Sequence, residues 1–565
     1  MRNIFFLILS CFCLLSVHAQ NETSKDHISL AGIWNFKLDP LNISIPVKGS
    51  NFVSRFPEEI TLPGSTDQAG KGFKTQDMSS LRLTRMFEYS GAAWYEKENI
   101  FIPESWKDQL LFLFLERVHW ESQVWINGKF VGKEESLSTP HLYDITSYVK
   151  FGDWNTVRIR VDNGNIHDIA YTHAISAETQ TNWNGIIGRM EIQAVSKVHI
   201  TDVQIYPLQK EKRLKIVAQI ANHSNLPVKG DIRIRCHFLN DSQLLHLNEK
   251  NTTFNSSDSL IHLVHYYDLG DKLYTWDEFE PNLYEIDYEI KCCGKSDVQK
   301  IKFGIRDFGT KGTHFTINDI PTFIRGAVNS CEFPITGYPP MSYEEWKKVM
   351  KVYKDYGFNC IRFHSWCPPE SAFQVADELG LYLQVENSDW RFTVGEDEAT
   401  NAFYLDEVQR IFKEYGNHPS FAFFCEGNEL VGKDCVDFLK EMLTEWKKDS
   451  RHLYVAASGY PTVEGSDFFD FYGARPQRWQ EGLKGRFNSQ PLNTRYDYID
   501  YVKKFSIPMV THEIGQWCAY PDFNQISKYI GVLKPYNYEL FREDLRNKKM
   551  LDQAHDFHIA SGKFQ

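Results

Sequence analysis

The sequence predicts a multidomain β plus α/β chain, in which two β-sandwiches precede an α/β domain built on a parallel barrel. The 565 residues suggest three or four domains at roughly 150 residues per domain. Up to about residue 306, short stretches of alternating apolar and polar residues are separated by turn residues, which is typical of antiparallel sheets. From residue 307 onward, apolar strands alternate with amphipathic helices, which indicates parallel strands covered by helices.

The composition is that of a soluble, folded protein. Hydrophobic residues make up 42% and charged residues 24% of the chain, which excludes a disordered or collagen-like chain. Lys and Arg together number 62 and Asp and Glu 74, so the net charge is −12. An acidic chain without a basic tract repels phosphate backbones, and we therefore expect no nucleic-acid partner.

Residues 1–19 have the form of a secretory signal peptide. Arg2 provides the positive charge, residues 4–15 are apolar, and Ala19 precedes the expected cleavage point. An alternative interpretation makes Cys11 a lipid-modified cysteine, because the residues before it resemble a lipobox. No later stretch reaches the ~18 apolar residues that a membrane-spanning helix needs. We expect a secreted or periplasmic protein without a transmembrane segment.

The first two domains are predicted to be sandwiches of short strands. In residues 27–198, the segment 157–161 alternates with period two, and Asn127-Gly128 supplies the positive φ angles of a tight hairpin turn. Residues 199–306 show the same rhythm over a shorter length, for example at 232–235, which suits a small immunoglobulin-like sandwich.

Residues 307–565 are predicted to form the α/β domain. A first helix begins after Ser342, which forms a capping box with Glu345, and it ends at Gly357. Strands are expected at residues 323–326, 359–363, 381–386, 421–425, 454–457, 469–472 and 509–511. The stretch 536–557 has a helical pattern, and no eighth strand is found. We therefore expect a (β/α)8 TIM barrel, with two alternatives for strand eight. Either the barrel is incomplete there, as in a C-terminally truncated chain, or a late strand is hidden in the sequence pattern.

Catalytic groups of such barrels lie at the C-terminal ends of the strands. The expected strand ends carry Arg362 and His364, then Glu386, then Glu426, Asn428 and Glu429, and lastly Glu513. Two carboxylates that face one cavity are what cleavage of a glycosidic bond requires, since one protonates the leaving oxygen and the other attacks carbon or activates water. A single glutamate at a strand end is more often structural, and Glu386 and Glu426 are rivals to the pair Glu429 and Glu513.

Several motifs resemble those of glycoside hydrolase family 2, the family of β-galactosidases, β-glucuronidases and β-mannosidases. They lie at 91–95, 124–128, 143–146 and 185–189 in the first domain, and at 315–318, 323–326, 359–364 (Asn-Cys-Ile-Arg-Phe-His), 417–420, 427–429 (Gly-Asn-Glu) and 511–515 (Thr-His-Glu-Ile-Gly) in the third. The resemblance implies a jelly-roll first domain, with Glu429 as the general acid/base and Glu513 as the nucleophile. It also implies that Asn428 binds the sugar 2-hydroxyl and that Arg362 helps to hold Glu513 ionised.

We expect a retaining exo-β-glycosidase, β-galactosidase-like, that acts on terminal β-linked sugars of plant or algal oligosaccharides or polysaccharides. It needs no metal ion and no organic cofactor, because two carboxylates suffice. His364, Trp390, Tyr472 and Trp517 are candidate walls of the sugar site, with packing at the barrel mouth as the alternative for each. A different function remains open, that of a carbohydrate-binding family member whose incomplete barrel is inactive. The sequence also leaves open the sugar, the oligomeric state and any disulfide pairing.

Overall fold

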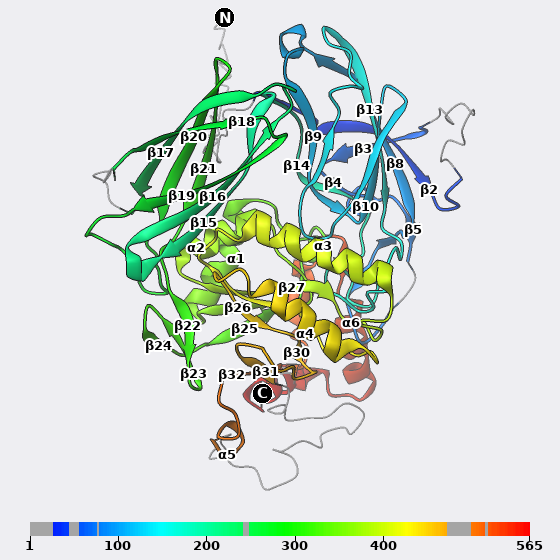
Figure 1. The fold of residues 1–565 in the computed structure, drawn as a ribbon. Helices are drawn as coiled ribbons and strands as arrows, with labels where there is room; N and C mark the ends of the chain where they lie inside the picture. The colour runs from blue at the N-terminus through cyan, green and yellow to red at the C-terminus, as the bar shows by residue number, and fades with distance from the viewer. Residues whose placement is uncertain are drawn as a thin grey trace, which may run out of the picture.

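The computed structural model describes residues 26–43, 56–75, 78–240, 248–471, 499–514 and 518–564 (Figure 1). Two β-rich regions, coloured blue to cyan and green, lie side by side above a region of helices and parallel strands. The predicted signal peptide, Cys11, Tyr472 and Trp517 lie outside the described residues. Within these residues, no helix combines the length and apolarity that crossing a bilayer requires.

The first sandwich encloses one apolar core between two antiparallel sheets. The sheets have the orders β11-β10-β13-β8-β2-β3 and β1-β14-β9-β12, with β4 paired to β14. The strands are β1 (Asp26–Ser29), β2 (Gly32–Asp39), β3 (Glu58–Leu62), β4 (Gly64–Ser65), β8 (Ala92–Ile102), β9 (Leu110–His119), β10 (Glu121–Ile126), β11 (Lys129–Glu135), β12 (His141–Asp144), β13 (Asp153–Asp162) and β14 (Gly185–Val195), with the short pair β5 (Phe73–Lys74) and β7 (Phe87–Glu88). The predicted turn between β10 and β11 is confirmed, since Asn127 and Gly128 have φ angles of 51° and 78°.

The second sandwich pairs a three-stranded sheet, β15-β16-β19, with a four-stranded sheet, β18-β17-β20-β21. The strands are β15 (Val198–Leu208), β16 (Arg213–Asn222), β17 (Val228–Phe238), β18 (Lys250–Ser256), β19 (Leu260–Asp268), β20 (Tyr284–Cys292) and β21 (Lys295–Phe303). The alternation in β17 places Ile232 and Ile234 in the core, whereas Arg233 and Arg235 are half-buried. The predicted order of two β-sandwiches is therefore confirmed.

The third region begins with a small antiparallel sheet and continues with parallel strands. The antiparallel strands are β22 (Phe308–Lys311), β23 (His314–Ile317) and β24 (Ile320–Thr322). Five parallel strands follow in the order β25 (Gly326–Asn329), β26 (Cys360–Phe363), β27 (Tyr382–Asp389), β28 (Phe421–Gly427) and β29 (Leu453–Val455), and a second parallel sheet contains β30 (Ser458–Gly459), β31 (Phe469–Phe471) and β32 (Met509–Thr511). The intervening helices are α1 (Tyr343–Asp355), α2 (Glu370–Leu379), α3 (Glu398–Tyr415) and α4 (Cys435–Trp446).

Among the described residues, the two parallel sheets are linked where Asn428 and Ser458 form a parallel bridge and where the N–H of Glu429 donates to the carbonyl of Ser458. In the part of the chain that the structure describes, no pairing joins β32 back to β25. A closed eight-stranded barrel therefore stays a prediction.

Local signals in this region have different outcomes. The cap of α1 is confirmed, because the Ser342 side chain accepts a hydrogen bond from the backbone N–H of Glu345. The first parallel strand was predicted at residues 323–326, which is wrong, since β25 begins only at Gly326. The physical reason is the Asn359 side chain, which accepts from the N–H of Arg325 at 2.7 Å and donates to the carbonyl of Phe323 at 2.9 Å. These backbone groups bond to a side chain instead of a neighbouring strand.

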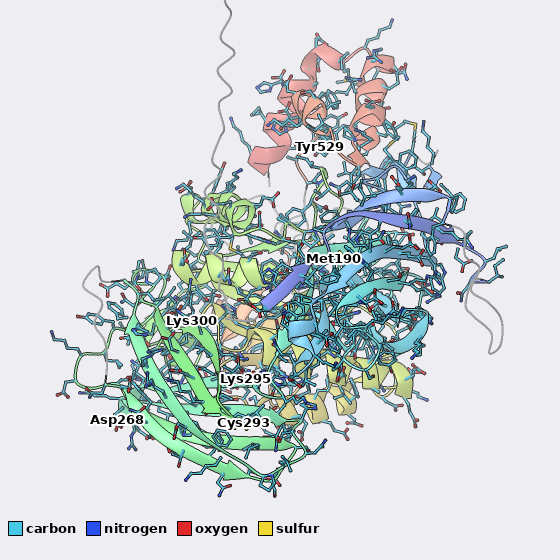
Figure 2. The ribbon with its side chains drawn as sticks, turned by 90° about the horizontal axis from the view of Figure 1, so that it is seen from above. Met190, Asp268, Cys293, Lys295, Lys300 and Tyr529 are labelled. Atoms are coloured by element: carbon cyan, nitrogen blue, oxygen red, sulfur yellow. The ribbon has the colours of Figure 1, made fainter. Side chains whose placement is uncertain are left out.

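The last described segments lie against the first sandwich. They are the short 3-10 helices η4 (Phe523–Lys528) and η5 (Leu551–Gln553), β33 (Leu533–Lys534), α6 (Tyr536–Asn547) and α7 (Ala554–Phe564). The short helix α5 (Ile499–Val502), by contrast, lies below β31 and β32, away from both sandwiches (Figure 1). The helical pattern predicted for 536–557 is confirmed, and β33 pairs with β6 (Thr84–Arg85). Figure 2 shows this red segment, with Tyr529 labelled, next to the blue strands and away from the green second sandwich that carries Asp268 and Cys293.

A buried ion pair ties α2 to the start of β28. The Nδ1 atom of His418 lies 2.6 Å from Asp377, and the Nε2 atom lies 3.0 Å from Glu370. Burial by itself would lower the pKa of His418, but the two carboxylates raise it to about 10. The charged imidazole therefore holds helix and strand together at the end of the sheet remote from Glu429.

Replacing His418 with glutamine is expected to destabilise the protein in a pH-dependent way. The folded pKa of about 10 lies above the ordinary value of 6.5, so the stabilisation is complete below pH 6.5 and is lost as the pH rises to about 10. Breaking a buried pair costs about 3–5 kcal/mol of unfolding free energy where the charge is present. Calorimetry should show the largest difference in Tm in mildly acidic buffer and the smallest at the alkaline limit. A difference that does not change with pH would contradict the assigned charge.

Candidate active site

Two parallel strands are each followed by a glutamate with a left-handed backbone. Glu429 comes after β28 and has φ 47°, and Glu513 comes after β32 and has φ 49°. Non-glycine residues at such angles are uncommon, cost roughly 1–3 kcal/mol each and cluster at functional sites. The same kind of turn thus carries a carboxylate beyond the carboxyl end of each strand.

The two carboxylates converge. One oxygen of Glu429, one oxygen of Glu513 and a ring nitrogen of His512 all lie within 4.8 Å of one another. Each glutamate side chain is 15% exposed, so the pair is partly buried and still reachable from solvent. The structure brings together the two glutamates that the sequence singled out.

Cationic and hydrogen-bonding groups surround Glu513. The Nε2 atom of His364 lies 3.1 Å from its Oε1 atom, Nε2 of His512 lies at 3.4 Å, and Nη1 of Arg362 lies at 3.7 Å. Burial by itself would raise the pKa of Glu513, but the contacts with the two histidines and the charge of Arg362 hold it well below its ordinary value. Glu513 is therefore ionised across the physiological pH range.

Arg362 is fixed by a different carboxylate, Glu386. The Nε and Nη2 atoms of Arg362 donate to the two oxygens of Glu386 at 2.6 and 3.2 Å, and Nη2 also donates to Oδ1 of Asn428 at 2.8 Å. Glu386 is fully buried and anchors the arginine, so it does not compete for the role of reacting carboxylate. Asn428 is also buried, and its Nδ2 atom has no hydrogen-bond partner among the described residues.

The second rival, Glu426, is buried away from the pair. It is fully buried, and Asn387 donates to its Oε2 atom at 3.4 Å. Burial and the nearby Asp389 raise its pKa well above the ordinary value, despite the neighbouring charge of Arg391. Glu426 is therefore enclosed by Asn387, Asp389 and Arg391, whereas Glu429 and Glu513 are each partly exposed.

The first sandwich contributes His173 and Tyr171 to the same site, where they pack against Trp390 from the loop after β27. The ring of Trp390 lies 4.9 Å from that of His364 and 6.0 Å from that of His173, measured between centroids. His173 also lies 3.1 Å from His364 between Nδ1 atoms, and Tyr171 packs edge-on against Trp390. His364 thus lies beside Glu513 with Trp390 packed against it, whereas Tyr472 and Trp517 are outside the described residues.

Sequence reasoning missed His173 and Tyr171, because they lie in an irregular segment of another domain and no local pattern links them to the strand ends. It also gave no role to His512, although this residue stands beside Glu513 in the strand-end motif. Its position next to Glu513 is the feature of the sequence that could have identified it.

Carboxylate oxygens and imidazole nitrogens are possible metal ligands. Among the described residues, Glu429, His512 and Glu513 form the group whose ligand atoms lie close enough together to share one ion. Burial opposes a charge on His512, but the two glutamates raise its pKa above the ordinary value. A proton on the ring opposes a cation at this point, and we assign no metal to it. The expectation that no metal or cofactor is needed stays a prediction.

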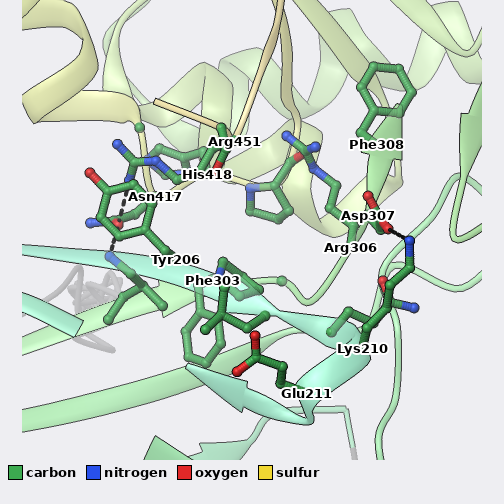
Figure 3. Close-up of a pocket in the computed structure, with 18 residues that line it drawn as sticks. Tyr206, Lys210, Glu211, Phe303, Arg306, Asp307, Phe308, Asn417, His418 and Arg451 are labelled. Carbon is green, nitrogen blue, oxygen red and sulfur yellow. Dashed lines mark hydrogen bonds and ion pairs between the residues drawn. The ribbon is translucent and has the colours of Figure 1, made fainter. Parts of the chain in front are cut away.

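A cavity of about 290 Å³ lies between the second sandwich and the amino ends of the parallel strands (Figure 3). Several of its charged side chains are engaged within the protein, since Lys210 pairs with Asp307 at 3.1 Å and Arg306 donates to the carbonyl of Pro419 at 2.6 Å. Strand β28 separates it from Glu429 by seven residues, about 23 Å at 3.3 Å per residue. We assign this cavity to packing between domains.

Gly459 leaves the space in which the catalytic candidates meet. It has φ 86°, and a Cβ atom added to it would lie 3.0 Å from Cγ of Glu429 and 3.1 Å from Nε2 of His512. These contacts are tighter than ordinary van der Waals packing, so a side chain at position 459 would push one of the two groups aside.

Replacing Gly459 with alanine is expected to lower kcat by about 10²-fold, because a displacement of even 1 Å at reacting groups has an effect of this size. The control is Gly465→Ala, since Gly465 also has a positive φ, 98°, but its added Cβ would meet only Leu443, at 4.0 Å. Both variants carry the backbone strain, and only the first disturbs Glu429. Steady-state kinetics and Tm should therefore separate them, and equal losses of activity would contradict the role given to Gly459.

Comparisons with known proteins agree with this arrangement. The family model "Glycosyl hydrolases family 2, sugar binding domain" matches residues 28–189, and the model "Glycosyl hydrolases family 2" matches residues 198–306. A β-galactosidase of Priestia megaterium is 26% identical over 377 residues, which cover 62% of this chain and 35% of that protein. A putative β-glucuronidase of Formosa agariphila is 24% identical over 509 residues, which cover 86% of this chain and 56% of that protein. The chain thus spans about a third to just over half the length of these relatives.

Solved structures show the same fold at low identity. The β-glucuronidase of Bacteroides uniformis superposes with a TM-score of 0.68 at 17% identity, covering 86% of this chain and 58% of that one. A glycosyl hydrolase family 2 member of Bacteroides cellulosilyticus gives 0.66 at 17% identity, covering 86% and 66%. The two consecutive domains at residues 28–189 and 198–306 therefore belong to glycosyl hydrolases family 2.

Proposed function

We propose that this protein is a retaining exo-β-glycosidase that releases a terminal β-linked sugar by double displacement. The observation that carries the proposal is that one carboxylate oxygen of Glu429 and one of Glu513 lie within 4.8 Å of each other. Retaining enzymes hold their two carboxyl groups about 5–5.5 Å apart, whereas inverting enzymes need about 6.5–9.5 Å to admit a water molecule. Relatives named as β-galactosidase and putative β-glucuronidase support the same class of reaction.

The reaction divides into two steps with opposite proton transfers. In the first, Glu513 attacks the anomeric carbon, the bond to the leaving oxygen breaks, and Glu429 gives its proton to that oxygen. Glu513 suits the attack because its surroundings keep it ionised. In the second, Glu429 takes a proton from water, which attacks the glycosyl ester and frees the sugar with its configuration retained.

Asn428 and its neighbours are suited to hold the sugar. Arg362 occupies the Oδ1 atom of Asn428, which leaves the buried Nδ2 group free to donate to the sugar 2-hydroxyl. Trp390 and His364 offer ring faces beside Glu513, and His173 of the first sandwich extends the same wall. These contacts would position the sugar before the chemical step.

The proposal includes the setting of the site. We assign the parallel strands to a (β/α)8 barrel at residues 307–565, after a jelly-roll domain at 27–198 and an immunoglobulin-like domain at 199–306. The strand order and the structural relatives support this division. The charged and apolar pattern of residues 1–19 supports export to the periplasm or the medium. Plant or algal oligosaccharides are the substrates proposed there.

The test is turnover of a panel of nitrophenyl β-glycosides, with the configuration of the first product followed by NMR. We expect hydrolysis with the β-galactoside fastest among galactoside, glucuronide, mannoside and arabinoside, and a β-configured product before mutarotation. An α-configured first product would contradict retention. Binding of sugars without turnover of any substrate would instead support the carbohydrate-binding alternative.

A further inference from the structure

His512 lies midway between the two carboxylates. Its Nε2 atom is 3.5 Å from Oε1 of Glu429 and 3.4 Å from Oε1 of Glu513, and the side chain is fully buried. The two distances are nearly equal, so the ring favours neither glutamate. None of the steps described above uses this residue.

The other side of the ring is fixed by a short hydrogen-bonded chain. The hydroxyl of Ser458 donates to Asp470, and the same oxygen lies 3.0 Å from Nδ1 of His512. A serine hydroxyl has one proton to donate, so Nδ1 must be the donor to Ser458. The Nε2 atom lies within ion-pair distance of both glutamates, 3.4 Å from the ionised Glu513 and 3.5 Å from Glu429, and this favours a proton on it. The geometry therefore places protons on both nitrogens and a positive charge on the ring.

Ser458 also connects the ring to the backbone of Glu429. Its carbonyl accepts the hydrogen bond from the N–H of Glu429 at 2.8 Å, while its hydroxyl holds His512. The next residue, Gly459, has no side chain and so leaves room for both Glu429 and His512. Strands β28, β30 and β32 are thus joined at the level of the two carboxylates.

The reaction moves a negative charge between the two sites that His512 faces. Before the first step the charge is on Glu513 and the proton is on Glu429. After it, Glu513 is a neutral ester and Glu429 carries the charge. A fixed cation at equal distance from both stabilises either arrangement without moving, and such preorganised charge is a large contribution to catalysis.

We propose that His512 is a positioning residue that holds Glu429 and Glu513 at their working separation and balances the charge as it passes from one to the other. The inference rests on the proposed function. The titratable and charged groups that face His512 are Glu429, Glu513, Asp470, Arg362 and His364. Arg362 and His364 lie 3.7 and 3.1 Å from Glu513, whereas His512 lies within 3.5 Å of an oxygen of each glutamate.

The experiment compares His512→Gln and His512→Ala with the unaltered protein on a nitrophenyl β-glycoside that the protein hydrolyses. Glutamine keeps a donor near the Nε2 position and loses the charge. We expect kcat to fall by about 10²-fold for glutamine and further for alanine, with little change in KM. Removing the positive charge disfavours the ionised form of both glutamates and raises the pKa of each. Both limbs of the profile of activity against pH should therefore move to higher pH by roughly one unit or more.

The control is His452→Gln, because His452 is also a buried histidine of the parallel sheet but donates only to the carbonyl of Phe421, at 2.7 Å. This variant should leave both limbs of the pH profile in place. The proposal is overturned if the His512 variants keep the kcat of the parent protein. It is also overturned if they lose activity while their pH limbs coincide with those of the parent, which is the signature of a merely structural role.

A second readout does not depend on turnover. Since the pKa of His512 is raised in the folded protein, its stabilisation is complete below the ordinary value of 6.5 and fades as the pH rises through the folded value. The Tm difference between the parent and His512→Gln should shrink over that range, whereas that of His452→Gln should stay constant there. If the parent protein hydrolyses the glycoside but the Tm difference does not shrink as the pH rises, the inference is overturned and the proposed function stands. If the Tm difference shrinks but the parent protein hydrolyses no glycoside, the positive charge on His512 between the two glutamates is supported and the glycosidase function is rejected.

Discussion

Replacing Glu513 with glycine is expected to lower kcat on an activated β-glycoside by roughly 10⁴-fold or more, because the displacement loses its nucleophile. The fold should remain intact. Glu513 has φ 49°, an angle that glycine adopts without strain, so the variant relieves a backbone cost while it removes the carboxylate. Steady-state kinetics and thermal unfolding measure the two effects separately.

Rescue of the Glu513→Gly variant by azide tests the position of the lost carboxylate. A small anion can enter the space left by the Glu513 side chain and attack the anomeric carbon from the same face as the lost carboxylate. We expect azide to restore turnover of a dinitrophenyl β-glycoside and to yield the α-glycosyl azide, because this attack inverts the configuration. A β-glycosyl azide, or activity that survives without azide, would remove Glu513 from the role of nucleophile.

Asp319→Gly is the matched control for this variant. Asp319 is also an acidic residue with a left-handed backbone, φ 64°, but it is exposed in the turn between β23 and β24. Its replacement removes a carboxylate and the same kind of backbone strain far from the chemistry. Unchanged kcat in this control would assign the loss in Glu513→Gly to the site.

The sequence predicts those parts of the molecule that local chemistry determines. The cap at Ser342 and the turn at Asn127-Gly128 follow from side chains a few residues apart, and both are observed. Glu429 and Glu513 are among the glutamates expected where parallel strands collect their carboxyl ends, and this does not require knowledge of loops. The resemblance to glycoside hydrolase family 2 at 427–429 and 511–515 then selects these two.

Other features depend on contacts between distant segments, and no local pattern encodes them. The sequence expects Glu386 and Glu426 at strand ends like Glu429, but the structure places them within β27 and β28. Their full burial, with Arg362 and Asp389 as neighbours, also separates them from Glu429. The contribution of His173 likewise arises when two domains pack together. The late start of β25 reflects the side chain of Asn359, which competes with strand pairing.

Replacing Glu429 with glycine should have an effect that depends on the leaving group. A general acid contributes about 10²–10⁴-fold to the rate, so kcat/KM for a substrate with a poor leaving group, such as an alkyl β-glycoside, should fall by about that factor. A dinitrophenolate departs without a proton, so kcat/KM for its glycoside should change far less. Glu429 has φ 47°, so the glycine variant should fold as the parent does.

The same variant is expected to respond to azide with the opposite stereochemistry. With Glu513 intact, the glycosyl ester still forms, and it accumulates because no base activates water for the second step. Azide needs no base, so it should raise kcat and give the β-glycosyl azide, the product of two inversions. Equal losses on both leaving groups, or an α-glycosyl azide, would show that Glu429 is not the acid/base. Because each glycine variant leaves one carboxylate in place, the two azide products together assign a role to each glutamate, which the symmetric approach of Glu429 and Glu513 to His512 does not do by itself.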